Sequence, residues 1–367
     1  MMAPGSTKMC YIAVIAFGFA CYFCLSVLYI YPETHICPST LTQDRKQTPA
    51  VKESVRPIVL LWFWPLKLKF DFNICASYFN IDSCILTDNR SLYSEAEGVI
   101  FFHKNIDAHL NNMPVETRPT FQKWIWLNEE SPRNTIKKPL LENIFNLTIS
   151  YRGDADIVWR DEVTIRKDGE KDDFILPKKD KLVCWIVSNR VAFTGTGTRE
   201  RYFNQLSQHI EVNLFGRAHT AKGLSFEDYY PTIAGCKFYL SFENSLFKDY
   251  MTEKVNGPMA AGTVPIVLGP PRENYERYLP SNSFIHVNDF PDAKSMAEHL
   301  KRLDNDIDAY LAYFDWRKYY TVLPHLLTVP KQFIHPICLG CDHIARDDEY
   351  HVVNDLHEWY FTKDLGL

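Results

Sequence analysis

The sequence predicts an α/β protein with two parallel-sheet domains, and the spacing of its apolar runs is the main reason. Short, continuous apolar runs recur along the chain, as expected for strands buried on both faces. The clearest unit spans residues 238–269, where the aromatic run 237–242 and the apolar run 264–268 flank a polar loop and a small-residue helical piece opening at Thr252. Such a β-loop-α-β unit builds a parallel sheet and places polar residues at the carboxyl end of its first strand, where ligands bind.

Size and composition agree with two domains and exclude some partners. The chain has 367 residues, of which 46% are hydrophobic, enough for two ordinary cores. The net charge of −5 gives no reason to expect nucleic acid as a partner. Of the ten cysteines, six fall in the globular part, an even number that fits disulfides in an oxidising compartment. Cys338-Leu-Gly-Cys341 is also compatible with half a zinc site or a redox pair, although no second CxxC accompanies it.

The N-terminal segment predicts a membrane anchor. Residues 11–31 contain no charged side chain and are long enough to span about 30 Å of hydrocarbon as one helix. Lys8 favours a cytoplasmic tail over residues 1–10 by the positive-inside rule. Residues 32–56, rich in Pro, Thr, Ser and Lys, predict an unfolded stem. If the rest is lumenal, the sequons at Asn89 and Asn146 are candidate glycosylation sites.

The remaining elements divide into two groups. The first α/β domain is expected over 57–178, and a charged linker, 165–181, leads into the second, 179–367. The expected strands, in order, are 58–64, 98–102, 124–127, 182–187, 211–215, 237–242 and 264–268. Helical patterns are expected at 199–209, 293–303 and 307–320.

Three pieces of the central unit resemble the donor-binding signature of the α1,3-fucosyltransferases: Phe242-Glu-Asn-Ser, Asp249-Tyr-Met-Thr-Glu-Lys, and Ala261-Gly-Thr-Val-Pro-Ile-Val-Leu-Gly-Pro. The similarity runs from about Val59 to the C-terminus and weakens between Val191 and Asp228. This family consists of Golgi enzymes that transfer fucose from GDP-fucose to N-acetylglucosamine. The resemblance implies the GT-B architecture, in which two Rossmann-like domains face a cleft and the C-terminal tail returns to the first domain. It also implies a type II Golgi membrane protein with a lumenal catalytic part.

The resemblance assigns the general base to Glu130. A sugar hydroxyl is a poor nucleophile at neutral pH and needs a proton acceptor. The strand in Trp124-Ile-Trp-Leu-Asn-Glu-Glu-Ser-Pro ends in two carboxylates, and strand alternation predicts that only one of Glu129 and Glu130 faces the cleft. In the family the glutamate directly before Ser-Pro is the proposed base, which is Glu130 here.

A second set of residues is expected to bind the donor. Lys254 matches the family lysine and can bring a cation to phosphate, and Arg199 aligns with an arginine that contacts the diphosphate. The other expected donor residues are Ser188, Asn189, Asn244, Tyr250 and Glu253.

Two segments depart from the family pattern. Residues 190–198 are longer and rich in Gly and Thr, which leaves Arg201 as an alternative to Arg199 by a register shift. Asn256-Gly257-Pro258 interrupts a helix, so either that helix starts near Pro258 or the donor site is altered.

The acceptor is expected to lie near Phe102-His103-Lys104. In the family a basic residue here accompanies type 2 N-acetyllactosamine on glycoproteins and glycolipids, which gives Lewis x products. Trp126 is expected either to stack on a sugar or to pack in the core. A homodimer remains an open alternative to a monomer.

The resemblance also implies three disulfides: Cys75–Cys338, Cys84–Cys341 and Cys184–Cys236. No metal or other cofactor is expected, because GT-B enzymes supply positive charge from side chains. Asp154-Ala-Asp156 has the form of a manganese-binding motif, which keeps a metal as an alternative. A membrane-tethered, catalytically silent glycan-binding protein is the competing function. The presence of Glu130, Glu253 and Lys254 argues against it, because glycan binding alone needs no nucleotide site.

Overall fold

The computed structural model describes residues 56–160, 163–165, 174–191, 194–220, 223–322, 333–347 and 349–362. The expected cytoplasmic tail, anchor and almost all of the stem lie outside these residues. None of the helices in the described part combines the length and the apolarity that are needed to cross a bilayer. All elements below belong to the compact unit Val55–Leu367.

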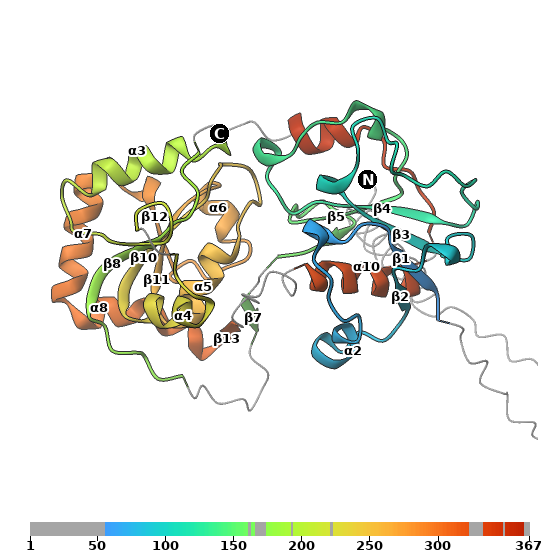
Figure 1. Ribbon diagram of the computed structural model, residues 1–367. Coiled ribbons are helices and arrows are strands. Elements are labelled where there is room, and N and C mark those ends of the chain that lie inside the picture. Colours follow the sequence, from blue (N-terminus) through green and yellow to red (C-terminus); the bar gives the residue numbers. More distant parts are fainter. Residues whose placement is uncertain are drawn as a thin grey trace, which may run out of the picture. The chain divides into compact units, whose positions relative to one another are not determined.

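The first sheet has six parallel strands in the order β2-β1-β3-β4-β5-β6 (Figure 1). The strands are β1 Ile58–Leu61, β2 Ile85–Thr87, β3 Gly98–Phe102, β4 Lys123–Leu127, β5 Leu147–Ser150 and β6 Ile157–Val158. The connections contain one α-helix, α2 (Ile74–Phe79), and the 3-10 turns Pro65–Lys67, Arg90–Leu92, His103–Asn105, Pro132–Asn134 and Pro139–Leu141. Short turns leave the faces of this sheet uncovered by their own connections, so other parts of the chain have to cover them.

Residues near the C-terminus cover the first sheet. On one face, α10 (Ile334–Arg346) packs against apolar side chains of β1, β3, β4 and β5. The disulfides Cys75–Cys338 and Cys84–Cys341 fasten this helix to residues around α2. On the other face, Leu356 and Tyr360 belong to the same apolar cluster as Trp126. A π-helical turn, Glu358–Thr362, ends the described chain.

The second sheet has five parallel strands in the order β12-β11-β10-β8-β9 (Figure 1). They are β8 Lys181–Ile186, β9 Asn213–Phe215, β10 Cys236–Phe242, β11 Val264–Leu268 and β12 Ile285–His286. Helices α3 (Gly197–Leu206), α7 (Ala293–Asn305) and α8 (Ile307–Leu311) supply the apolar cluster on one face. Helices α4 (Phe226–Ala234) and α5 (Glu253–Ala261) cover the other. The remaining elements are α6 Arg272–Tyr275, the turns Val287–Asp289 and Ala312–Lys318, and the antiparallel pair β7 Val163–Ile165 with β13 Tyr320–Val322.

The disulfides follow the pairing that the family resemblance implies. The third bridge, Cys184–Cys236, joins β8 to β10 within the second sheet. Cys338 and Cys341 are both bonded to other cysteines. The zinc and redox alternatives for this CxxC are therefore wrong.

The helix expected over 199–209 spans Gly197–Leu206, and the strand expected over 211–215 spans Asn213–Phe215. Three other elements also differ. The first strand ends at Leu61 rather than at residue 64, because Pro65, which lacks an N–H, opens a 3-10 turn. The helix expected over 307–320 is a short α-helix followed by a 3-10 turn. Helix α5 starts at Glu253 and contains Pro258, so the alternative of a start near Pro258 is wrong. The fixed φ of proline is compatible with a helix, but Pro258 has no backbone N–H, so the helix lacks one hydrogen bond.

The order of strands marks a topological switch point in the second sheet. From β8 the chain moves outward to β9 and then returns to β10 on the opposite side of β8. The carboxyl ends of β8 and β10 therefore flank a topological switch point, the usual ligand position in an open parallel sheet. Residues 187–189 follow β8, and Glu243 follows β10.

Candidate active site

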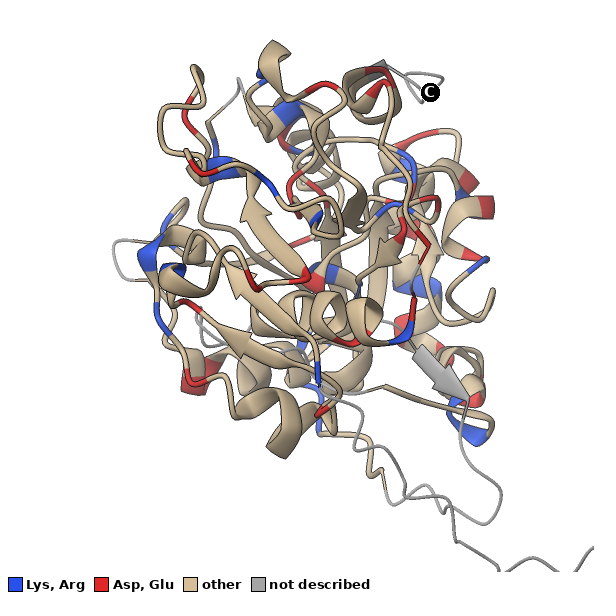
Figure 2. Ribbon diagram, turned by 90° about the vertical axis from the view of Figure 1, so that its right-hand side faces the viewer, with Lys and Arg blue, Asp and Glu red and all other residues tan. Residues whose placement is uncertain are grey.

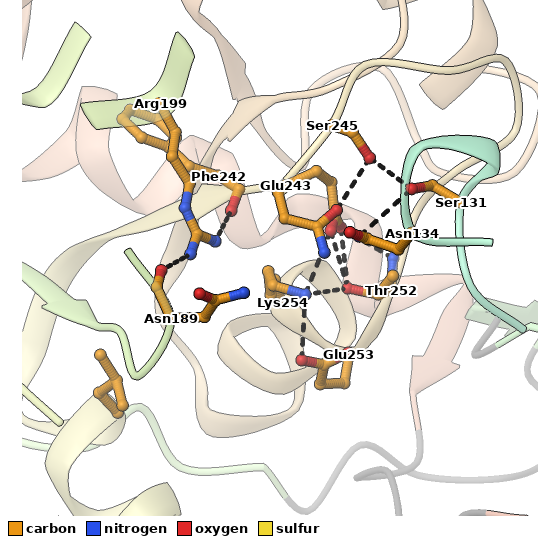
Figure 3. A network of polar contacts seen from close by, with 12 residues as sticks. Ser131, Asn134, Asn189, Arg199, Phe242, Glu243, Ser245, Thr252, Glu253 and Lys254 are labelled. Carbon is orange, nitrogen blue, oxygen red and sulfur yellow. Dashed lines mark hydrogen bonds and ion pairs between the residues drawn. The ribbon is translucent and has the colours of Figure 1, made fainter. Parts of the chain in front are cut away.

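Arg199 links the two strand ends at the switch point. Its guanidinium donates to the Phe242 carbonyl at 3.2 Å and to the Asn189 carbonyl at 2.5 Å (Figure 3). The residue lies in α3, is 5% exposed, and its Nε has no hydrogen-bond partner. A buried cation with an unused N–H favours an anion at this place.

Arg199, and not Arg201, occupies this position. Arg201 is exposed and donates to the Thr198 hydroxyl. The loop before α3 reaches the site at Gly195, whose φ is +95°. A Cβ added to this glycine would lie 2.5 Å from the Asn244 carbonyl oxygen. A side chain here would thus clash with backbone, which explains the glycine in this divergent segment.

Lys254 sits among oxygen atoms at the start of α5. Its Nζ lies 3.2 Å from a Glu243 carboxylate oxygen and 3.2 Å from Glu253 Oε1, and it donates to Thr252 Oγ1 at 2.8 Å (Figure 3). The Lys254 side chain is 24% exposed, whereas that of Glu243 is fully buried. Burial opposes the charge of Lys254, but the two carboxylates outweigh it and raise the pKa of the ammonium. Lys254 is therefore charged at neutral pH.

The other expected donor residues divide into exposed and buried positions. Ser188 and Asn189 are exposed directly after β8. Asn244 is half-buried, and its Oδ1 accepts from the Ser245 hydroxyl at 2.9 Å. Tyr250 is only 3% exposed and its ring packs edge-on against Tyr151 at 4.9 Å.

Glu130 lies within the electrostatic field of this group. It is half-buried three residues after β4, and burial raises the pKa of its carboxyl. The ammonium groups of Lys104 and Lys254 act in the opposite direction. The structure thus brings Glu130, from the first sheet, near Lys254, from the second. Glu129 is half-buried as well.

Two contacts hold the Glu130 segment in place. The Tyr360 hydroxyl donates to the Glu130 carbonyl. The hydroxyls of Ser131 and Ser245 are 2.6 Å apart, which joins the residue after Glu130 to the loop after β10 (Figure 3). No local pattern in the sequence predicts either contact, because the partners are far apart in the chain.

The expected acceptor residues do not share one surface. His103 is 3% exposed and Trp126 is 1% exposed. The Trp126 indole N–H donates to His103 Nδ1 at 3.0 Å, and the other ring nitrogen of His103 lies 2.9 Å from the Ile136 carbonyl. Burial and Lys138 lower the pKa of His103 to about 4, so the ring is neutral. Both side chains have a packing role in this structure, and only Lys104 is exposed.

The two sequons differ in accessibility. Asn89 is exposed, and its Oδ1 accepts from the Ser91 backbone N–H and hydroxyl. Asn146 is 1% exposed, and its amide nitrogen donates to the His351 carbonyl at 2.6 Å. A glycan on Asn146 would break that bond and has no room in the fold. The expectation for Asn146 is therefore corrected, and Asn89 remains the candidate.

The acidic pair at Asp154 and Asp156 does not form a joint cation site. Asp154 accepts both hydrogen bonds of a bidentate pair with Arg152. Asp156 accepts instead from Thr148. Within the described residues, no group of three or more His, Cys, Asp or Glu side chains has the arrangement of a metal site.

Glu243 is the residue of this site that sequence reasoning left without a role. It directly follows β10, and it is 1% exposed. Its position beside the expected donor residue Asn244, at the end of a buried strand, was the available signal.

Comparison with known proteins identifies relatives over both sheets. Two family models match: "Fucosyltransferase, N-terminal" over residues 54–161, and "Glycosyltransferase family 10 (fucosyltransferase) C-term" over residues 176–359. The 4-galactosyl-N-acetylglucosaminide 3-alpha-L-fucosyltransferase 9 proteins of Mus musculus and Homo sapiens are each 44% identical over 305 residues, which cover 83% of this chain and 82% of those proteins. Human 4-galactosyl-N-acetylglucosaminide 3-alpha-L-fucosyltransferase FUT5 is 37% identical and covers 87% of this chain.

A solved structure supports the fold. The crystal structure of an α1,3-fucosyltransferase with GDP-fucose superposes with a TM-score of 0.52, covering 85% of this chain and 96% of that one, at 17% sequence identity. At this identity the similarity concerns the fold alone.

Proposed function

The chain belongs to glycosyltransferase family 10, the fucosyltransferases, and on this premise we propose that it transfers L-fucose from GDP-β-L-fucose in α1,3 linkage to N-acetylglucosamine. The observation that carries the proposal is that a carboxylate after the first sheet lies near a cation beside the second, because Ser131, next to Glu130, is 2.6 Å from Ser245 in the loop that leads to Lys254. Glu130 follows β4, yet the charge of Lys254 at the start of α5 acts on it. Transfer from a sugar nucleotide requires a base next to positively charged groups that bind the diphosphate.

The reaction is a single in-line displacement. The acceptor hydroxyl oxygen attacks the anomeric carbon of fucose, its proton passes to Glu130, and the bond from that carbon to the β-phosphate oxygen breaks. GDP leaves with the bonding electrons, and the β-linkage of the donor becomes an α-linkage. Lys254 and Arg199 stabilise the negative charge that grows on the leaving diphosphate.

The raised pKa of Glu130 suits this role. A base is most effective when its pKa lies near the working pH, and burial moves a carboxyl in that direction. The positive charges of Lys104 and Lys254 oppose this rise and favour the ionised carboxylate.

We propose N-acetyllactosamine-type glycans as acceptors, which gives Lewis x products. The relatives' names specify 4-galactosyl-N-acetylglucosaminide as their substrate. In this chain Lys104 is exposed and its charge acts on the carboxyl of Glu130, so Lys104 is the residue that we propose contacts the acceptor. Figure 2 shows basic and acidic residues interspersed along the ribbon.

We also propose that the chain is a single-pass type II protein of the Golgi membrane, with a lumenal GT-B catalytic part whose two domains face a cleft. The apolar run 11–31 supports the anchor. Three disulfides support an oxidising lumen. Protease protection of the C-terminal part in sealed vesicles, and a glycan at Asn89, would be the expected results.

Incubation of the full chain, in detergent, with GDP-fucose and N-acetyllactosamine tests the proposal. A trisaccharide with fucose α1,3-linked to N-acetylglucosamine is the expected product, identified by mass and linkage analysis. Binding of N-acetyllactosamine without any fucosylated product would instead support the silent glycan-binding alternative.

A further inference from the structure

Glu243 is a buried carboxylate that the mechanism above does not use. Its backbone N–H donates to the Leu268 carbonyl at 2.8 Å, which extends the pairing of β10 with β11 by one residue. The side chain is fully buried. Burying a carboxylate is costly unless it is paired and hydrogen-bonded, so the partners of Glu243 are informative.

Those partners are Thr252, which caps the start of α5, and Lys254, the second residue of that helix. Thr252 donates to Glu243 Oε1 from its backbone N–H and from its hydroxyl, both at 2.9 Å (Figure 3). Lys254 Nζ lies 3.2 Å from Glu243 Oε2. One buried carboxylate therefore fixes both the backbone at the start of the helix and the ammonium one residue inside it.

Thr252 connects the two contacts. Its hydroxyl has one hydrogen, which it can give to Glu243, and it accepts from Lys254 Nζ at 2.8 Å. Lys254 thus has three oxygen partners, on Glu243, Thr252 and Glu253. A lysine side chain has several rotatable bonds, and holding it in one conformation before the donor arrives reduces the entropy lost on binding.

We propose that Glu243 is a positioning residue that holds the ammonium of Lys254 where it meets the diphosphate of the donor. This inference rests on the proposed function, since it assigns a diphosphate to that site. Glu243 itself is too deeply buried to contact the substrate. Its effect on catalysis passes through Lys254 and Thr252.

A double-mutant cycle of Glu243→Gln and Lys254→Met tests the proposal. Glutamine keeps the size and one acceptor oxygen but removes the charge. We expect Glu243→Gln to lower kcat/KM for GDP-fucose by about 10-fold or more, and to change it by less than about twofold when Lys254 is already Met. The KM for the acceptor should stay unchanged in all variants. Equal losses in both backgrounds would overturn the proposal, because a merely structural role does not depend on Lys254.

Asp249→Asn provides a matched control. Asp249 is a buried acid of the same loop, 2% exposed, that accepts from Gly153 N–H and from the Asn274 amide. The decrease in kcat/KM caused by Asp249→Asn should add to the decrease caused by Lys254→Met. If Glu243→Gln does not fold, as judged by thermal unfolding, the cycle is repeated with Glu243→Asp, which keeps the charge and shortens the reach. Coupling with Lys254→Met is again expected, and additivity would again contradict the proposal.

Two readouts separate this inference from the proposed function. An unmodified chain that transfers no fucose would contradict the proposed function. The same cycle measured on GDP affinity needs no transfer and still decides the inference. If the unmodified chain is active and the cycle is additive in kcat/KM and in GDP affinity, only the inference is wrong.

Discussion

Burial and nearby positive charge have opposite effects on the pKa of Glu130. Burial is the larger cause and raises the pKa, while Lys104 and Lys254 lower it. The base works only when ionised, so kcat/KM must fall as the pH drops through this pKa. The acid side of the pH profile therefore reports the surroundings of Glu130.

Removing Lys104 should move that acid limb. In Lys104→Met the opposing charge is gone, so the pKa of Glu130 rises further and the limb moves to higher pH. The rates on the neutral plateau should change less. Lys137→Met is the control, because Lys137 is exposed on the same part of the chain and faces the Phe361 ring. If the acid limb of the pH profile does not move in Lys104→Met, a group other than Glu130 causes that limb.

Single residues also show where sequence reasoning ends. Glu130, Lys254 and Arg199 were found because each follows or opens an element with a clear pattern. The burial of Asn146, His103 and Trp126 depends on contacts with residues that are distant in the chain, such as His351. A sequon or an aromatic residue has the same local signature whether it is exposed or enclosed.

At the scale of elements, continuous apolar runs were the most reliable signal. Strands β3 and β11 have the expected bounds, Gly98–Phe102 and Val264–Leu268. Helix ends were predicted less well, since α5 includes Pro258 and α8 stops at Leu311. Local propensity fixes the type of a long element better than its ends.

The C-terminal segment should matter for catalysis through Tyr360. This buried hydroxyl donates to the Glu130 carbonyl. Tyr360→Phe leaves that carbonyl unsatisfied, which typically costs about 1–3 kcal/mol, and should lower kcat because the base is held less firmly. Measuring kcat together with the unfolding temperature checks this expectation.

Tyr310→Phe is the matched control for Tyr360→Phe. Tyr310 is equally buried and its hydroxyl donates to the Lys237 carbonyl in the second sheet. It should lose stability with little change in kcat. Equal kcat values for the two variants would contradict the role of Tyr360.

The two disulfides of α10 should be strongly non-additive. Each closes a loop with a sequence separation of 263 or 257 residues, yet both join the same two segments. Once one bridge is present, the second closes only a short loop. By the chain-entropy estimate, removing the first bridge costs about 3 kcal/mol, and removing the remaining one costs about 5.5 kcal/mol.

Denaturant unfolding of Cys84→Ser/Cys341→Ser and of the variant lacking both bridges measures these two steps. If removing the first bridge lowers the free energy of unfolding as much as removing the second, the bridges act independently.

At the scale of the whole molecule, the candidate site depends on two sheets. The base follows a strand of the first sheet, and the donor residues follow strands of the second. The sequence predicted both parallel sheets, because each strand has its own local pattern. It did not predict how residues of α10 and 349–362 complete the first sheet, because no local pattern encodes a contact over 200 residues. The family resemblance alone supplied the return of the C-terminal tail to the first domain and the disulfides that fasten it.

This division allows chemistry and donor binding to be separated in one measurement. Glu130→Gln keeps the size of the side chain but cannot take a proton at neutral pH. We expect fucosyl transfer to fall by about 10²–10⁴-fold. GDP-fucose affinity, measured by calorimetry, should stay near that of the unmodified chain, and Glu129→Gln should be far milder. Normal transfer by Glu130→Gln, with loss in Glu129→Gln, would contradict the assignment of the base.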